Sequence, residues 1–163
     1  MCYFGFLGVE ITPAKLPPPL RSADALWSAV SSVVARHHAG GMRSPDAREN
    51  ALALPGTSVV GALACAQCAC TDRERLVAEL GPLAEELLEA AEVRAVVLGY
   101  LWASGEATTE LSATLDTLPR VAASSPERSF VLRVTRSEGA PWPTQTLAHA
   151  GRTERKRDRR RRR

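Results

Sequence analysis

The segment Val93–Trp102 constrains the fold of this chain most strongly. All of its residues are apolar except Arg94 and Gly99. Such a short apolar run is typical of a β-strand that is covered on both faces. Because covering a strand in this way requires helices packed on a sheet, the segment favours a layered domain of helices and strands. The composition agrees, since 45% hydrophobic and 24% charged residues in a chain of 163 are usual for one globular core.

The N-terminal part of the chain contains two further strand patterns and one helix pattern. Tyr3–Ile11 combines aromatic and β-branched residues, which predicts a buried strand. Ser22 is a typical N-cap, and the apolar residues that follow it have helical spacing as far as about Arg36. Ser58–Cys65 is predicted to be a second buried strand, although its small residues would also suit a helix.

The helix pattern that follows begins with a capping box. Thr71 and Glu74 are three residues apart, so each side chain can accept a backbone N–H at a helix start. The helical region is expected to end near Ala91, and Gly81 with Pro82 is expected to split it or to restart it.

The last part of the chain is expected to add one helix and one strand. A short helix is predicted over Thr108–Leu118, stopped by Pro119. Ser129–Val134 is predicted to be the last strand, and the prolines that follow indicate irregular structure. Residues 1–151 are therefore expected to form a single domain.

The net charge of +3 is distributed unevenly. Residues 152–163 contain nine Lys or Arg and two acidic residues, whereas residues 1–151 contain twelve basic and sixteen acidic residues. The tail, 152–163, has no apolar residue and is expected to be disordered. It could bind nucleic acid without sequence preference, although no aromatic residue lies within it to stack on bases. It could equally be a solvated extension or the product of a frameshift.

Other features favour a soluble cytoplasmic protein. No apolar run reaches the roughly 18 to 20 residues that cross a bilayer, and Tyr3–Ile11 lacks the basic residues that precede the hydrophobic region of a signal peptide. Three of the four cysteines, Cys65, Cys68 and Cys70, are crowded together. This spacing is not that of a disulfide framework and fits a reducing compartment.

The same cysteines have a spacing that could bind zinc. Cys65 and Cys68 form a Cys-x-x-Cys pair, and His37 or His38 could complete a tetrahedral set with Cys70. A structural site normally uses two paired motifs, however, and cysteines among alanines also suit small buried positions. We therefore expect no metal and no cofactor. The two histidines follow a predicted helix and are expected to bond its C-terminal carbonyls.

Cys2 is the residue whose position carries the most chemistry. Removal of the initiator Met would leave a thiol beside its own α-amine, which has a reference pKa of about 8 and can act as a base. Such a nucleophile needs an extended segment behind it, and Tyr3–Val9 supplies one. A small, partly buried cysteine without a role would give the same sequence.

Four fragments of the chain, in order, resemble class II glutamine amidotransferase domains. Met1–Gly8 looks like the family's N-terminal cysteine and glycine-punctuated strand. Ala35–Met42 looks like the segment that follows the family's first helix. Gly99–Glu106 is similar to Gly-His-x-Arg-Trp-Ala-Ser/Thr followed by Gly-Glu, and Leu147–Gly151 is similar to an apolar-His-Asn-Gly loop.

A second alignment competes with the first over the last third of the chain. Val134–Ser137, followed by Gly139–Pro141, also resembles the Val-Arg-x-Ala and Gly-x-Pro segment of the family's smaller branch. The two alignments exclude each other.

The resemblance implies an α+β fold of the N-terminal-nucleophile type, a layered αββα sandwich of two sheets. It implies that Cys2 is the catalytic nucleophile, that the backbone N–H of Gly151 contributes to the oxyanion site, and that Trp102, Ala103 and Ser104 bind substrate. An active domain of this kind hydrolyses glutamine through a thioester and releases ammonia.

Two departures from the family pattern predict low activity. Leu101 occupies the position of an arginine that pairs with the substrate carboxylate, and Ala150 occupies that of an oxyanion-binding asparagine. A degenerate or truncated domain is the leading interpretation. The alternative is a small non-enzymatic protein whose basic tail contacts nucleic acid or an acidic partner, and neither interpretation involves a membrane or specifies an oligomeric state.

Overall fold

Strand β1 (Tyr3–Ile11) lies in the interior of a sheet. The computed structural model describes residues 3–44, 54, 56–63, 73–102, 108–124 and 129–147. In it, β1 pairs antiparallel with β3 (Val59–Leu63) on one side and with β4 (Val93–Trp102) on the other. The predicted strands at the N-terminus and at Val93–Trp102 are confirmed, and so is the interior position of the first.

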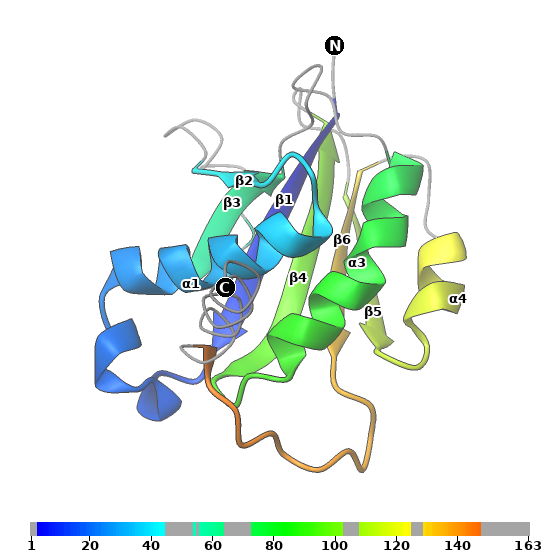
Figure 1. The fold of residues 1–163 in the computed structure, drawn as a ribbon. Helices are drawn as coiled ribbons and strands as arrows, with labels where there is room; N and C mark the ends of the chain where they lie inside the picture. Colours follow the sequence, from blue (N-terminus) through cyan, green and yellow to red (C-terminus); the bar gives the residue numbers. More distant parts are fainter. Residues whose placement is uncertain are drawn as a thin grey trace, which may run out of the picture.

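The strands of the described residues form one six-stranded mixed sheet (Figure 1). The strand order is β2-β3-β1-β4-β6-β5. The edge strand β5 is parallel to its neighbour β6, and the other neighbours are antiparallel. The remaining strands are β2 (Met42–Arg43), β5 (Thr109–Thr114) and β6 (Phe130–Thr135).

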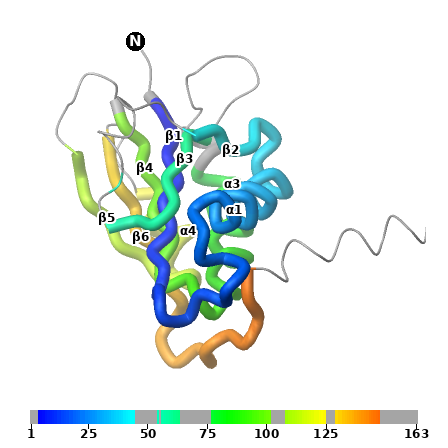
Figure 2. Tube along the Cα trace, turned by 90° about the vertical axis from the view of Figure 1, so that its left-hand side faces the viewer, coloured from blue at the N-terminus to red at the C-terminus, as the bar shows by residue number. Residues whose placement is uncertain are grey.

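The α-helices cover one face of this sheet (Figure 2). Alternate residues of each strand point toward them, so that in β6 Phe130, Leu132 and Val134 are buried in the main core while the residues between them are half-buried. The helices are α1 (Ala23–His37), α3 (Arg73–Leu88) and α4 (Leu118–Ala123), and two short 3₁₀ turns, η1 (Pro13–Lys15) and η2 (Pro18–Leu20), precede α1.

The opposite face of the sheet carries a second, smaller apolar cluster. Glycines in β1 and β4 allow other segments to approach this face closely. A Cβ at Gly8 would lie 2.5 Å from Thr57 Cγ2, and a Cβ at Gly99 would lie 2.7 Å from Leu54 Cδ2. The buried members of the cluster are Phe6, Leu54, Ala62, Val97 and Leu101, with Phe4 and Val131 half-buried beside them. In the described residues this face has no second sheet packed on it.

Several local predictions are confirmed. The Ser22 hydroxyl accepts a hydrogen bond from the Ala25 N–H at 3.2 Å and caps α1. The strand predicted over Ser58–Cys65 is observed over Val59–Leu63, and the strand predicted over Ser129–Val134 is observed one residue later. Thr71 lies outside the described residues.

The helix predicted over Thr108–Leu118 is wrong. Thr109–Thr114 is strand β5, and Pro119 lies in the first turn of α4 rather than ending a helix. The segment alternates in burial, with Ala113 in the main core and Ser112 exposed, and its backbone pairs with β6. Tertiary pairing therefore decides a sequence whose local pattern is ambiguous.

The interruption predicted at Gly81 and Pro82 is also wrong, because α3 is continuous with Pro82 inside it. An internal proline costs about 3 kcal/mol. Burial of one large aliphatic side chain contributes about 1.5–3 kcal/mol, and α3 buries several. These are Leu80, Leu83, Leu87 and Leu88.

The close packing at Gly8 gives a stability prediction. Gly8→Ala is expected to lower the free energy of unfolding by about 1–3 kcal/mol, because the new methyl group would overlap the Thr57 side chain. Urea unfolding measures this change. In a Thr57→Gly background the same substitution should cost much less, and an equal cost in both backgrounds would show that Thr57 does not pack against β1.

Candidate functional site

Three of the four amidotransferase-like fragments meet at one end of the sheet. The register places Tyr3 opposite Trp102. In the sequence, Cys2 directly precedes Tyr3 and Ala103 directly follows Trp102. Two residues along, Gly5 lies opposite Leu63, and Leu63 lies opposite Met42, which ends the fragment after α1. Antiparallel pairing thus brings together segments that are far apart in the sequence.

The predicted catalytic residues Cys2 and Gly151, and the predicted substrate-binding residues Ala103 and Ser104, lie outside the described residues. Trp102 is described as the last residue of β4 but not in its side chain. For this predicted site, the described residues therefore include only strands that adjoin its residues in the sequence.

At this end of the sheet, the side chains of Tyr100 and Leu101 pack in the two apolar clusters. Leu101, which the sequence resemblance would align with a family arginine, is 9% exposed and belongs to the second apolar cluster. Tyr100 points to the helix face, and its ring centroid lies 5.6 Å from that of Phe130. Neither side chain supplies a cationic group for a substrate carboxylate.

The fourth fragment begins at the opposite end of β1. The Leu147 N–H donates to Glu92 Oε2 at 3.3 Å, and the Thr12 N–H donates to the Glu92 carbonyl at 2.8 Å. Leu147 is therefore near the Ile11 end of the strand, and Gly151 lies outside the described residues.

The competing alignment also places its arginine at this far end. Arg136 donates from Nε to the Leu88 carbonyl at 2.8 Å and from Nη2 to the carbonyls of Ala90 and Val93 at 2.7 and 2.6 Å. It caps the C-terminal end of α3, where carbonyls lack helical partners. Burial lowers the pKa of this guanidinium.

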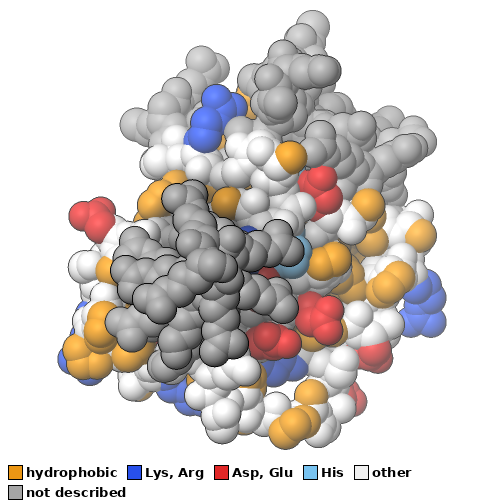
Figure 3. Space-filling view, in the orientation of Figure 1, with side chains coloured by type: hydrophobic (Ala, Val, Ile, Leu, Met, Phe, Trp, Pro, Cys, Tyr) orange, Lys and Arg blue, Asp and Glu red, His pale blue; other side chains and the backbone are white. Residues whose placement is uncertain are grey.

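The two histidines connect α1 to α3. His37 Nε2 lies 2.5 Å from Glu86 Oε2, and His38 Nδ1 contacts Glu79 Oε2. These carboxylate partners correct the prediction that the rings bond the helix C-terminal carbonyls. Figure 3 looks onto this side of the molecule and shows a histidine beside acidic side chains.

The Glu86 carboxylate is held by two side chains of α1, Arg36 and His37. Burial raises the pKa of Glu86, but hydrogen bonds from Arg36 and His37 outweigh burial and lower it below its ordinary value. Among the described residues, no three His, Cys, Asp or Glu side chains are grouped so as to hold a metal ion. Cys65, Cys68 and Cys70 lie outside those residues.

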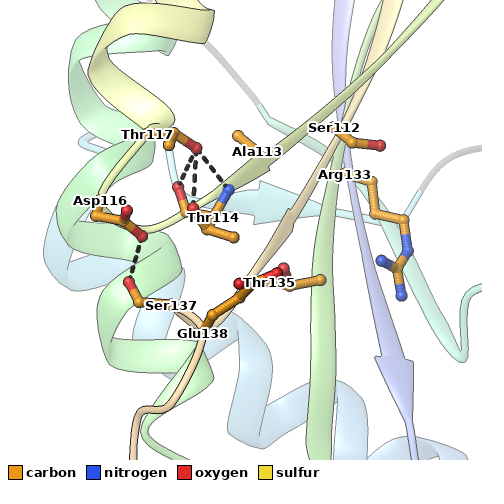
Figure 4. Close-up of a pocket in the computed structure, with 9 residues that line it drawn as sticks. All are labelled: Ser112, Ala113, Thr114, Asp116, Thr117, Arg133, Thr135, Ser137 and Glu138. Atoms are coloured by element: carbon orange, nitrogen blue, oxygen red, sulfur yellow. Dashed lines mark hydrogen bonds between the residues drawn. The ribbon is translucent and has the colours of Figure 1, made fainter.

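A polar hollow on strands β5 and β6 was not predicted from the sequence. Its volume is about 470 Å³, and it lies between β5, β6 and the turns that follow them (Figure 4). The row of residues Thr114, Thr135, Ala95 and Glu10 crosses the sheet beside it, at the end remote from Tyr3. Its lining is Ser112, Ala113, Thr114, Asp116, Thr117, Arg133, Thr135, Ser137 and Glu138.

One wall of the hollow is fixed by an ion pair that crosses β4. Arg133 donates from Nε to Glu10 Oε1 at 2.8 Å and from Nη2 to Glu10 Oε2 at 2.7 Å. In β4, Ala95 is the partner of Glu10 and Val97 is the partner of Arg133, so the ion pair runs diagonally across this strand. The hydrogen bond from Arg133 lowers the pKa of Glu10 more than burial raises it.

Hydroxyl groups fix the opposite wall. The Ser137 hydroxyl donates to Asp116 Oδ1 at 2.5 Å, and the Thr114 N–H donates to Thr117 Oγ1 at 2.9 Å. Hydrogen bonds from Ser137 and then Thr114 lower the pKa of Asp116. Polar residues alternate with apolar ones in both β5 and β6. If Thr109–Thr114 had been predicted as a strand, this alternation would have indicated the hollow.

The chain matches no model of a protein family, no curated protein and no solved structure. None of the helices in the described part of the chain has the length and apolar character needed to cross a bilayer.

The ion pair between Glu10 and Arg133 gives a pH prediction. Pairing lowers the pKa of Glu10, so the stabilisation is present above the ordinary carboxyl pKa of 4.5 and is lost as pH falls through the lowered value. Glu10→Gln is expected to cost about 0.5–1 kcal/mol at pH 7, because both partners are partly exposed.

Thermal unfolding of wild type and Glu10→Gln at neutral and acidic pH measures this contribution. The two midpoints should converge at acidic pH, and Glu110→Gln, at an exposed position of β5, should show no such convergence. A constant difference between wild type and Glu10→Gln at every pH would contradict an electrostatic contribution.

Proposed function

We propose that this chain is an N-terminal-cysteine hydrolase domain resembling the class II glutamine amidotransferases. The observation that carries the proposal is the position of β1, which is paired on both sides and is aligned with β4 from Tyr3 onward. A nucleophile one residue before a strand held in this way has a rigid support.

The chemistry of the proposal uses groups of residue 2 alone. Once Met1 is removed, the α-amine of Cys2 takes the thiol proton, and the thiolate attacks the side-chain amide carbon of glutamine. The amine returns the proton to the leaving nitrogen, so ammonia departs and a thioester remains. Water then hydrolyses the thioester to glutamate and restores the thiol.

The layers of the described structure support the finer part of the proposal, the αββα sandwich. The helix-covered sheet supplies one helical layer and one sheet layer. The other sheet face carries the second apolar cluster, whose members Phe4 and Val131 are half-buried, and an apolar face of this kind suits packing against a second sheet.

We infer that this domain is a weak glutaminase. The buried Leu101 cannot pair with a substrate carboxylate, a contact that the resemblance assigns to an arginine at this position. Without this charge-assisted contact, glutamine is expected to bind weakly. Acylation of Cys2 is therefore expected to be easier to detect than steady ammonia release.

Labelling with a glutamine-derived diazoketone tests the proposal. The intact mass of the purified chain should lack Met1, and one label should be found on Cys2 after peptide mapping. Cys2→Ser should prevent labelling, whereas the matched control Cys65→Ser should not. Ammonia release should stay low in wild type.

Retention of Met1, or equal labelling of all cysteines, would contradict the nucleophile assignment. Fast ammonia release that Cys2→Ala abolishes would show that Leu101 does not occupy the family position assigned to it.

A further inference from the structure

The segment that follows β6 crosses the base of the sheet and is held at several points (Figure 1). We name residues 136–147 the strap. Arg136 anchors its first residue to three carbonyls, as described above. Near its end, the carbonyl of Gln145 accepts from the Ala91 N–H at 2.8 Å, and Leu147 is 1% exposed. The strap therefore has a fixed position on the domain.

Trp142 lies in the middle of the strap and is 51% exposed. It is the only large hydrophobic side chain that is exposed among the described residues. Two cations lie over its ring: Lys15 Nζ is 3.6 Å from the ring centroid, and Arg136 Cζ is 4.4 Å from it. An exposed indole beside two positive charges is a combination that stacks on bases and attracts phosphates.

The two cations differ in how easily they can move. Arg136 is held by backbone carbonyls of α3 and β4, so it supports the ring in place. Lys15 is an exposed residue of η1, and a cation–π contact at an exposed site is weak. A flat ligand can displace Lys15 from the ring and leave its ammonium group beside the ligand's phosphate.

We propose that Trp142 and Lys15 form a stacking site for single-stranded nucleic acid, which the basic tail extends. Arg152, the first cation of the tail, follows Leu147 by five residues, and a fully extended chain covers that interval in about 18 Å. The tail contains nine Lys or Arg and two acidic residues, whereas the rest of the chain has a net charge of −4. The cations available for phosphate contacts beyond Lys15 therefore lie mainly in residues 152–163 of the sequence.

The chemistry favours a single strand over the other polyanionic surfaces. A base paired in a duplex does not expose a face to a tryptophan ring, whereas an unpaired base does. An anionic membrane would attract the same cations, but it offers no flat ring on which Trp142 could stack.

Binding of a fluorescent uridine 12-mer to the full chain, measured by anisotropy at several salt concentrations, tests the proposal. Trp142→Leu should weaken binding roughly fivefold or more without changing the slope of log affinity against log salt, because stacking adds affinity without charge neutralisation. Trp142→Phe, which keeps an aromatic ring, should retain most of the affinity. Lys15→Gln should make the slope shallower by about 0.7.

Deletion of residues 152–163 should remove most of the binding. The thermal midpoint should stay nearly unchanged, and this measurement is the control that the truncated domain is folded. Since Trp142 is half-exposed, its substitutions should also leave the midpoint nearly unchanged.

Wild-type affinity in Trp142→Leu, together with loss of binding on tail deletion, would overturn the proposal in favour of the tail alone. Equal affinity for a 12-bp duplex would overturn it as well. Binding of vesicles that contain phosphatidylserine, without binding of the 12-mer, would replace the proposal with a membrane contact.

Discussion

The pairing of β1 with strands on both sides is the constraint on which the rest of this structure depends. β1 joins β3 to β4, and β4 in turn pairs with β6, which pairs with β5. If β1 detached, the sheet would divide into two parts and both apolar clusters would open, because Leu7 and Val9 belong to one and Phe6 to the other. The strand also connects the proposed hydrolase site to the polar hollow, because Cys2 precedes its first residue and Glu10 lies near its last.

The face of the sheet opposite the helices changes character along β1. Near Tyr3 it is apolar, with Phe6 and Leu101 packed together, whereas near Ile11 it is polar, with Glu10 and Arg133 paired across β4. The strap and Trp142 also lie at the Ile11 end, because the strap ends beside Glu92. Hydrolysis and nucleic-acid binding, as proposed here, would therefore use opposite ends of the sheet.

Runs of one residue class predicted much of this fold. The continuous apolar segments became β1 and β4, and the N-cap at Ser22 became the start of α1. Where a segment mixes small, polar and β-branched residues, as Thr109–Thr114 does, the local pattern does not separate helix from strand, and the partner β6 decides. The partners of His37 and His38 likewise come from α3, and the stacking of Lys15 on Trp142 joins residues far apart in the sequence.

Hydrogen exchange of the native chain tests the central position of β1 most directly, because amides in the most stable part of a sheet exchange only when the domain unfolds. The amides of β1 that bond to β3 or β4 should be among the slowest in the protein and should match those of β4. Exchange of the Tyr3–Ile11 amides at the rate of an unstructured terminus would contradict this account. In that case Cys2 would have no rigid support, and the sheet would be built on β4 alone.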